Sequence, residues 1–302
     1  MSDMSQVLIS EGFKALYESV PRDADQKEIE AFYAINQMLE NDSPTNYAFV
    51  TPRGSDTGFP DFGFNVRTSN RKSIDVHIEF KKDAGAYMGS MRDWVFDGRQ
   101  YRPGAKAIDD ADKELMLLSM NKNPTIVAGG KRLLKAFDDA AKKHGLRVKE
   151  LANYTLARLA PPKERKLRQA VAQEVKNNNV QQIGNIQGGF GSTIIDFYNK
   201  KFKKAIRSSA DGSILLFMIK DRVWLMNQDG NVDQDDIKEI AQKFGVREFD
   251  SRNFNRSSID ADLEVRISIR KADDLFKQPF IDVKAGMKMR RQSAPRGGTR
   301  II

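Results

Sequence analysis

The sequence predicts a mixed α/β protein whose first 130 residues follow the order helix, three strands, helix, strand. A helical stripe of Phe32, Ile35 and Leu39 follows a capping aspartate. Apolar and polar residues alternate strictly over 73–82, which is typical of a strand with one buried face. The helical period and the strand period therefore both occur in the first part of the chain, and both occur again in its last third.

The elements are expected in a definite order. In the first part they are a helix at 25–39, strands at 46–51, 59–67 and 73–82, a glycine-containing loop, a helix at 107–120 and a short strand at 125–128. From 131 to about 208 the pattern is helical, with two interruptions. The last third mixes strands at 213–219, 222–226, 263–269 and 280–284 with a helix at 234–244. These late strands could complete one sheet with the early ones.

Shifts in composition divide the chain into four parts: 1–130, a helical region at 131–210, an α/β portion at 211–283 and a tail at 284–302. The tail holds six basic residues and no acid, together with glycine and proline. We expect a flexible cationic tail of the kind that follows phosphate backbones. The alternative is an end that only increases solubility.

Composition excludes several kinds of site. The 302 residues include no cysteine and two histidines, His77 and His144, so disulfides, thiolate nucleophiles and multi-histidine metal sites are excluded. The net charge is +9 and the mean hydropathy is −0.56. No apolar run approaches a membrane span, and the N-terminus lacks the pattern of a secretory signal. We expect a cytoplasmic protein whose chemistry depends on carboxylates, lysines or hydroxyls.

The polar face of strand 73–82 carries an unusual set of groups. Side chains alternate across a strand, so Asp75, His77, Glu79 and Lys81 lie in a row about 6.6 Å apart, opposite an apolar face. The preceding strand, 59–67, carries Asp61 on the side opposite its apolar residues. If the two strands pair antiparallel, Asp61 reaches the Glu79 end of its neighbour. This pairing would bring two carboxylates and a lysine together.

These residues carry a resemblance to a known family. Pro60-Asp61, followed after 17 intervening residues by Glu79-Phe80-Lys81, resembles the PD-(D/E)XK signature of the restriction-endonuclease-like nucleases. The (D/E)xK pattern occurs six times in the chain, but only this copy has a Pro-Asp upstream at hairpin distance. The resemblance implies a restriction-endonuclease-like αβββαβ core, followed here by the helical middle region and the C-terminal α/β portion.

The resemblance also implies roles for site residues. Asp61, Glu79 and the Phe80 carbonyl would hold Mg²⁺ or Mn²⁺, and Lys81 would orient or activate the attacking water. Glu28, on the first helix, would add a carboxylate. The alternatives are that Glu79 and Lys81 belong to an exposed cross-strand charge pattern and that Glu28 only complements a helix dipole. For His77, a hydrogen-bonded structural role is the alternative to a role in the site.

Basic residues in four places are candidates for contact with nucleic acid. They lie after the (D/E)xK strand, in the following loop, on the helix at 192–208 and in the tail, and they are Lys82, Arg92, Arg99, Lys200, Lys203, Lys204, Arg290 and Arg291. The alternative is that these are solvated surface charges.

The sequence as a whole predicts a metal-dependent deoxyribonuclease, with an endonuclease favoured, in a restriction, recombination, repair or phage context. Its partner would be DNA and not a membrane, and a homodimer is possible because each chain supplies one site. Two alternatives remain. One is a nucleic-acid-binding protein that uses the same scaffold without cleaving, and the other is a phage-type structural or assembly protein.

Overall fold

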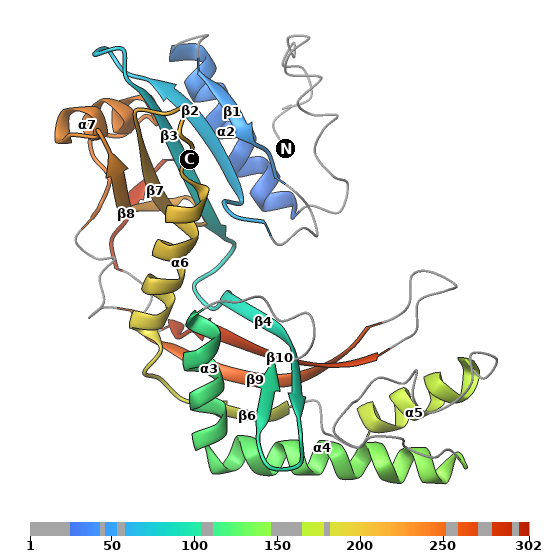
Figure 1. Cartoon of the computed structure of the whole chain (residues 1–302). Coiled ribbons are helices and arrows are strands. Elements are labelled where there is room, and N and C mark those ends of the chain that lie inside the picture. The colour runs from blue at the N-terminus through green and yellow to red at the C-terminus, as the bar shows by residue number, and fades with distance from the viewer. Residues whose placement is uncertain are drawn as a thin grey trace. The chain divides into compact units, whose positions relative to one another are not determined.

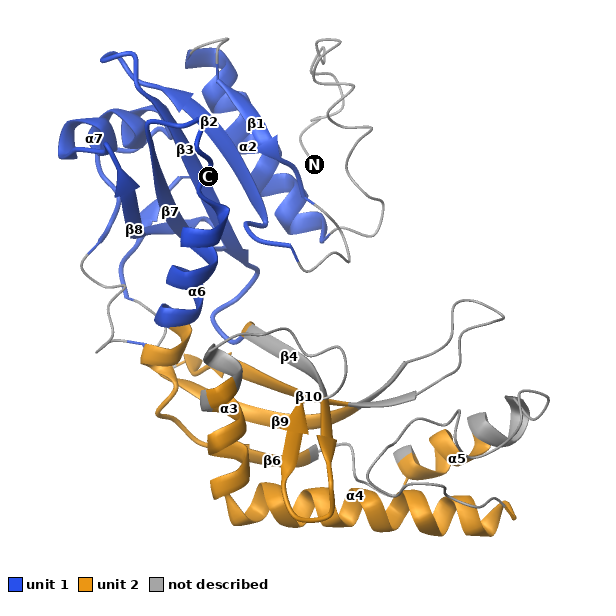
Figure 2. Cartoon of the chain, viewed as in Figure 1, with its two compact units in different colours: residues 1–86, 195–259, 293–302 blue, residues 87–194, 260–292 orange. Residues whose placement is uncertain are grey.

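A computed structural model describes residues 25–42, 46–52, 58–103, 111–145, 165–177, 182–251, 259–270, 280–291 and 296–301. The chain forms two compact units (Figure 2). Unit 1 consists of residues 1–86, 195–259 and 293–302, and unit 2 consists of residues 87–194 and 260–292. Unit 2 is therefore inserted into the sequence of unit 1 at two places: residues 87–194 and, nearer the C-terminus, residues 260–292.

Unit 1 is built on a six-stranded sheet with the order β1-β2-β3-β7-β8-β11 (Figure 1). Its elements are α2 (Gln26–Asp42), β1 (Tyr47–Val50), β2 (Phe62–Arg67), β3 (Ser73–Lys81), most of α6 (Gly191–Ala205), β7 (Gly212–Ile219), β8 (Arg222–Gly230), α7 (Gln234–Lys243) and β11 (Thr299–Arg300). β1, β2 and β3 form an antiparallel meander, and β7 lies parallel to β3.

The alternation seen in the sequence of β3 places different partners on the two faces of this sheet. Ile74, Val76, Ile78 and Phe80 join a buried apolar cluster that also contains residues of α2 and α7. The opposite face of β3 packs against α6, where the ring of His77 contacts that of Phe202. Unit 1 is thus layered, with α2 and α7 on one face of the sheet and α6 on the other.

The sheet of unit 1 joins early and late parts of the chain. Residues 74–81 of β3 pair in register with 212–219 of β7. The expectation that the last third completes one sheet with the first holds for the strands at 213–219 and 222–226, which are β7 and β8. It is wrong for the strands at 263–269 and 280–284, which belong to a second sheet. The element order that surrounds β3 is α2, β1, β2, β3, α6, β7, with unit 2 inserted between β3 and α6.

Unit 2 contains a five-stranded antiparallel sheet with the order β5-β4-β10-β9-β6. Its elements are β4 (Tyr87–Phe96), β5 (Tyr101–Pro103), α3 (Ala111–Lys122), α4 (Pro124–Lys143), α5 (Arg165–Asn177), β6 (Gln182–Ile186), β9 (Ala261–Arg270) and β10 (Phe280–Met289). α4 packs on one face of the sheet through glycines: Gly129 lies against Ile183, and Gly130 lies against Phe96. A Cβ at either glycine would clash with those neighbours, so the close approach requires glycine.

The second helix and fourth strand of the predicted core are corrected by the structure. The segment predicted as a strand at 125–128 lies inside α4, because the Asn123 side chain accepts a hydrogen bond from the Ile126 N–H and Pro124 occupies the first turn. The helix predicted at 107–120 corresponds to α3, which belongs to unit 2. Within unit 1, the helix and the strand that follow β3 along the chain are α6 and β7.

Other predicted boundaries also differ from the structure. The middle region is not wholly helical, since β6 pairs with β9 between α5 and α6. The loop predicted after β3 contains β4 and β5. The compact units change at 86/87, 194/195, 259/260 and 292/293, instead of near 130, 210 and 283. None of these changes coincides with a composition shift.

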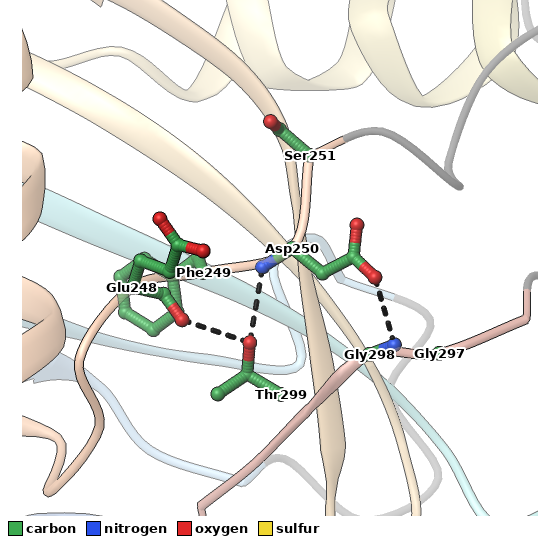
Figure 3. A pocket seen from close by; sticks show the side chains of 7 residues that line it. All are labelled: Glu248, Phe249, Asp250, Ser251, Gly297, Gly298 and Thr299. Carbon is green, nitrogen blue, oxygen red and sulfur yellow. Dashed lines mark hydrogen bonds between the residues drawn. The ribbon is translucent and has the colours of Figure 1, made fainter.

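The prediction of a flexible tail from 284 onward is wrong for residues 284–289 and 299–300, which form strands. Residues 292–295 and 302 lie outside the described residues. Lys284 and Lys288 lie within β10, which pairs along its length with β9. Near the C-terminus, Gly298 N–H donates to Asp250, and the Thr299 hydroxyl donates to the Glu248 carbonyl (Figure 3). The residues that make these contacts line a surface pocket, and the contacts hold β11 at the edge of the sheet.

The structure as a whole is mixed α/β, with two mostly antiparallel sheets. Within the described part of the chain, no helix has the length and apolarity required to cross a lipid bilayer.

Candidate active site

The β2–β3 hairpin brings Asp61 and Glu79 together. β2 begins at Phe62, which pairs with Ile78, so Asp61 lies immediately before β2. There its Oδ2 accepts a hydrogen bond of 2.7 Å from the backbone N–H of Phe80. The antiparallel pairing expected from the sequence is confirmed, and it places Asp61 beside the Glu79 end of β3.

Lys81 lies between the two carboxylates. Its Nζ donates to Glu79 Oε1 at 2.6 Å and lies 3.8 Å from Asp61 Oδ2. The Lys81 side chain is only 14% exposed. The neighbouring carboxylates outweigh its burial and raise its pKa above the ordinary lysine value, so the ammonium stays charged at neutral pH.

Tyr198, which lies on α6, completes the environment of Glu79. Its hydroxyl donates to Glu79 Oε1 at 2.9 Å, and its ring packs against Phe217. Oε1 thus receives two donors, one from Tyr198 and one from Lys81. Among the described residues, no donor reaches Glu79 Oε2 or Asp61 Oδ1. Each carboxylate therefore keeps one oxygen available.

The carboxylates at this site are difficult to ionise together. Burial, followed by the charge of Glu79, raises the pKa of Asp61 to about 7. Burial, followed by the charge of Asp61, raises the pKa of Glu28 to about 8. Glu28, in the first turn of α2, is therefore near enough to belong to the same electrostatic cluster. Lys81 alone does not balance the negative charge.

The available donors fit a hard divalent cation only in part. Within the described segments, no group of three or more histidine, aspartate or glutamate side chains is placed to hold a metal ion. The set that remains is one oxygen each from Asp61 and Glu79, together with the Phe80 carbonyl. That carbonyl leaves β3 on the same side as the Phe80 N–H, because each residue of a strand directs both groups to one neighbour. All three are oxygens, which Mg²⁺ and Mn²⁺ prefer.

Lys201 is a second basic residue at the site. The sequence places it with the basic residues of the helix at 192–208 but does not connect it with Asp61. Its positive charge lowers the pKa of Asp61, opposing the effect of burial. Its Nζ lies 4.4 Å from the centre of the Phe197 ring and 5.7 Å from that of Phe59. Tyr198 and Lys201 were not predicted as site residues, because α6, which carries them, follows β3 in the chain only after the insertion of unit 2.

The other end of the polar face of β3 is structural. Asp75 is fully buried and accepts two hydrogen bonds from Arg207, at 2.6 and 2.7 Å. His77 is also fully buried, between the rings of Phe49 and Phe202. Neither ring nitrogen of His77 has a hydrogen-bond partner in the described part of the structure. The hydrogen-bonded role considered for His77 is therefore not observed, and His77 does not join the carboxylates.

The basic residues predicted to contact nucleic acid fall in both units. Those in unit 1 are Lys82, Lys200, Lys203 and Lys204, and those in unit 2 are Arg92, Arg99, Arg290 and Arg291. In unit 1, Lys82 follows β3 with its side chain 60% exposed, and the three other lysines lie on α6.

The four candidate arginines in unit 2 differ in their surroundings. Arg290 lies 3.4 Å from Asp260 and 3.6 Å from Asp262, so its charge is largely compensated. Arg99 and Arg291 are exposed. Arg92 lies on β4, but its side chain is outside the described residues.

Comparisons with protein-family models, with curated proteins and with solved structures found no match to this chain.

Proposed function

We propose that the chain is a metal-dependent nuclease that hydrolyses phosphodiester bonds in DNA, and that Asp61, Glu79 and Lys81 form its active site. The observation that carries the proposal is the cluster itself: two carboxylates share one lysine, and each keeps one oxygen free of donors within the described residues. The raised pKa of Asp61 indicates unbalanced negative charge, which a cation would relieve.

The residues divide the work of hydrolysis. Asp61, Glu79 and the Phe80 carbonyl would hold Mg²⁺ or Mn²⁺, which when bound supplies positive charge to the phosphoryl oxygens and makes water more acidic. Lys81 stays protonated, so it acts as a donor that orients water and offsets phosphate charge, and not as a general base. Tyr198 holds Glu79 in place.

The arrangement of unit 1 also supports the proposal. The order α2, β1, β2, β3, α6, β7, with β7 parallel to β3, agrees with the αβββαβ core that the resemblance implies. The site lies where β2 begins and β3 ends, in keeping with the PD-(D/E)XK pattern. In this interpretation unit 2 is an insertion between the third strand and the second helix of the core.

Cleavage of DNA tests the proposal. Supercoiled plasmid and linear duplex are incubated with the wild type, with Asp61→Asn and with Asp229→Asn, in Mg²⁺, Mn²⁺ or EDTA. Asp229 is an exposed residue paired with Ser213, at the other end of the sheet, and provides the matched control. We expect metal-dependent cleavage that falls about 100-fold or more in Asp61→Asn and is unchanged in Asp229→Asn. Equal cleavage by Asp61→Asn would refute the assignment of the site.

A second candidate is a DNA-binding protein that does not cleave. It is favoured by the position of the Lys81 ammonium, which lies 2.6 Å from Glu79 and already serves as a counter-ion there. Binding of DNA by the wild type without cleavage in either metal would support this candidate against the nuclease.

A further inference from the structure

Lys201 follows Tyr198, the residue whose hydroxyl donates to Glu79, by three positions on α6. Residues three apart in a helix are neighbours on its surface, about one turn from each other. Side chains of a helix lean toward its N-terminus, which directs that of Lys201 toward Tyr198. Tyr198 is buried, whereas Lys201 is partly exposed. Lys201 therefore lies next to the buried carboxylates and is also accessible to solvent.

Two aromatic rings hold the Lys201 ammonium. Its Nζ lies 4.4 Å from the centre of the Phe197 ring, four residues earlier on α6, and 5.7 Å from that of Phe59. Phe59 comes two residues before Asp61, so the ammonium lies close to the segment that carries this carboxylate. Cation–π contacts attract the ammonium, but its three N–H groups stay available as donors. The rings thus position the charge of Lys201 without neutralising it.

The carboxylates around Lys201 do not take its donors. Among the described residues, none of them forms an ion pair with Lys201. Asp61 is close enough for the charge of Lys201 to lower its pKa, but its hydrogen bond comes from the Phe80 N–H. Asp196, the acidic residue of α6, is five positions from Lys201, which is about 140° around the helix axis. It therefore lies on a different side of α6.

Lys81 differs from Lys201 in this respect. Its Nζ lies 2.6 Å from Glu79 and 3.8 Å from Asp61, and its side chain is only 14% exposed. Much of its charge is therefore balanced within the site. A phosphodiester that approaches the carboxylates requires a further cation to offset its negative charge. The lysine that remains available for this contact is Lys201.

We propose that Lys201 is a substrate-binding residue that contacts a phosphate of the nucleic-acid strand at the edge of this site. A lysine ammonium is a compact charge on a flexible stem, so it can follow a phosphate oxygen without a fixed geometry. The two rings limit where that ammonium can lie and so direct it to the strand that occupies the site. Lys201 would supply binding, and the carboxylates of Asp61 and Glu79 the chemistry.

The inference rests on the proposed function, because the phosphate belongs to the same substrate, but it is tested without cleavage. Fluorescence anisotropy measures binding of labelled single-stranded and duplex oligonucleotides in EDTA at several salt concentrations. The test variant is Lys201→Gln, and Lys201→Arg keeps the charge. The matched control is Lys238→Gln, which removes one positive charge from an exposed position of α7, the helix on the opposite face of the sheet.

We expect Lys201→Gln to bind about fivefold or more weakly at 0.1 M salt, with a salt-dependence slope smaller by about one, because one phosphate contact is lost. Lys201→Arg and Lys238→Gln should keep the slope of the wild type. A slope unchanged in Lys201→Gln, or reduced equally in Lys201→Arg or Lys238→Gln, would overturn the inference. Thermal unfolding confirms that the variants fold, and Lys201→Met replaces Lys201→Gln if that one does not.

A second comparison separates contact with phosphate from a merely structural role. If Lys201 served only as a counter-ion of Asp61, its replacement would have no effect once that carboxylate is neutral. The effect of Lys201→Gln on affinity is therefore measured again in the Asp61→Asn background. We expect the same loss of affinity and of slope in both backgrounds. Disappearance of the loss in Asp61→Asn would overturn the inference.

The outcome is independent of the nuclease test. If cleavage fails but Lys201→Gln loses affinity and slope, the phosphate contact stands and the active-site proposal falls. If cleavage depends on Asp61 but affinity in EDTA does not depend on Lys201, the reverse holds.

Discussion

Replacement of Asp61 by asparagine removes a carboxylate that burial and the neighbouring Glu79 make difficult to ionise. The pKa of Asp61 rises from 3.8 to about 7 in the folded chain, a change of about 3 units, and each unit corresponds to about 1.36 kcal/mol. Ionised Asp61 therefore lowers the free energy of unfolding by at most about 4 kcal/mol. Two effects make the gain from the substitution smaller than this limit: the Asp61 side chain is 23% exposed, and Asp61→Asn removes an ion-pair partner of Lys81. We therefore expect Asp61→Asn to stabilise the protein by about 1–2 kcal/mol at pH 8.

The direction of the pH dependence follows from the same shift. Because the folded-state pKa is raised, the favourable contribution of protonated Asp61 is present below about pH 4 and is lost as the pH rises to about 7. The advantage of Asp61→Asn is thus absent near pH 4 and complete above pH 7. Urea unfolding in EDTA, with Asp229→Asn as the control, measures it. A variant that is less stable at pH 8, or equally stabilised at every pH, would refute the reasoning.

Three further changes have defined outcomes. Arg207→Met leaves the buried carboxylate of Asp75 without its guanidinium and should lower the free energy of unfolding by about 3 kcal/mol in urea titrations. Burial lowers the pKa of His77 to about 4, so the wild type loses stability as the pH falls from about 6.5 to 4. His77→Leu should lack this loss when unfolding is compared at pH 7 and pH 5. Tyr198→Phe removes the hydroxyl that holds Glu79 and should lower kcat for DNA cleavage about tenfold, with KM unchanged.

Arg300 provides the control for the Arg207 prediction. Arg300 pairs with Asp221 at 2.7 Å, but its side chain is 74% exposed, so Arg300→Met should change stability by less than about 1 kcal/mol. Equal effects of the two arginine variants would contradict the role given to burial. A Tyr198→Phe enzyme with altered KM and unchanged kcat would contradict the role given to Tyr198.

The site could be predicted from the sequence where local patterns determine structure. The alternation over 73–82 and the short turn before it are sufficient to place Asp61 beside Glu79, because a hairpin fixes the register of its two strands. The helical stripe of Phe32 and Ile35 likewise identifies the face of α2 that packs on the sheet.

The rest of the core depends on contacts between distant parts of the chain. β7 pairs with β3 across more than 130 intervening residues, and no periodicity in the sequence records which strands pair. The apolar segment at 125–128 has the composition of a strand, but the Asn123 cap and Pro124 begin a helix there. Tyr198 and Lys201 belong to the site only because α6 packs beside β3.

The tail shows the same limit. A run of basic residues with glycine and proline is typical of flexible ends, yet alternate residues of 283–289 are apolar and pair with β9. The lysines in this segment are the polar half of a strand. Their charge therefore marks a face of the unit 2 sheet.

The central claim is that Asp61 and Glu79 together hold a divalent cation. Isothermal titration of Mn²⁺ at pH 7 into the wild type and Glu79→Gln tests it, and repetition in buffers of different ionisation enthalpy counts the protons released. We predict one site in the wild type that is lost in Glu79→Gln. Binding should release protons, because pKa values of about 7 for Asp61 and about 8 for Glu28 leave both carboxyls partly protonated. No binding by the wild type, or equal binding by the variant, would contradict the claim.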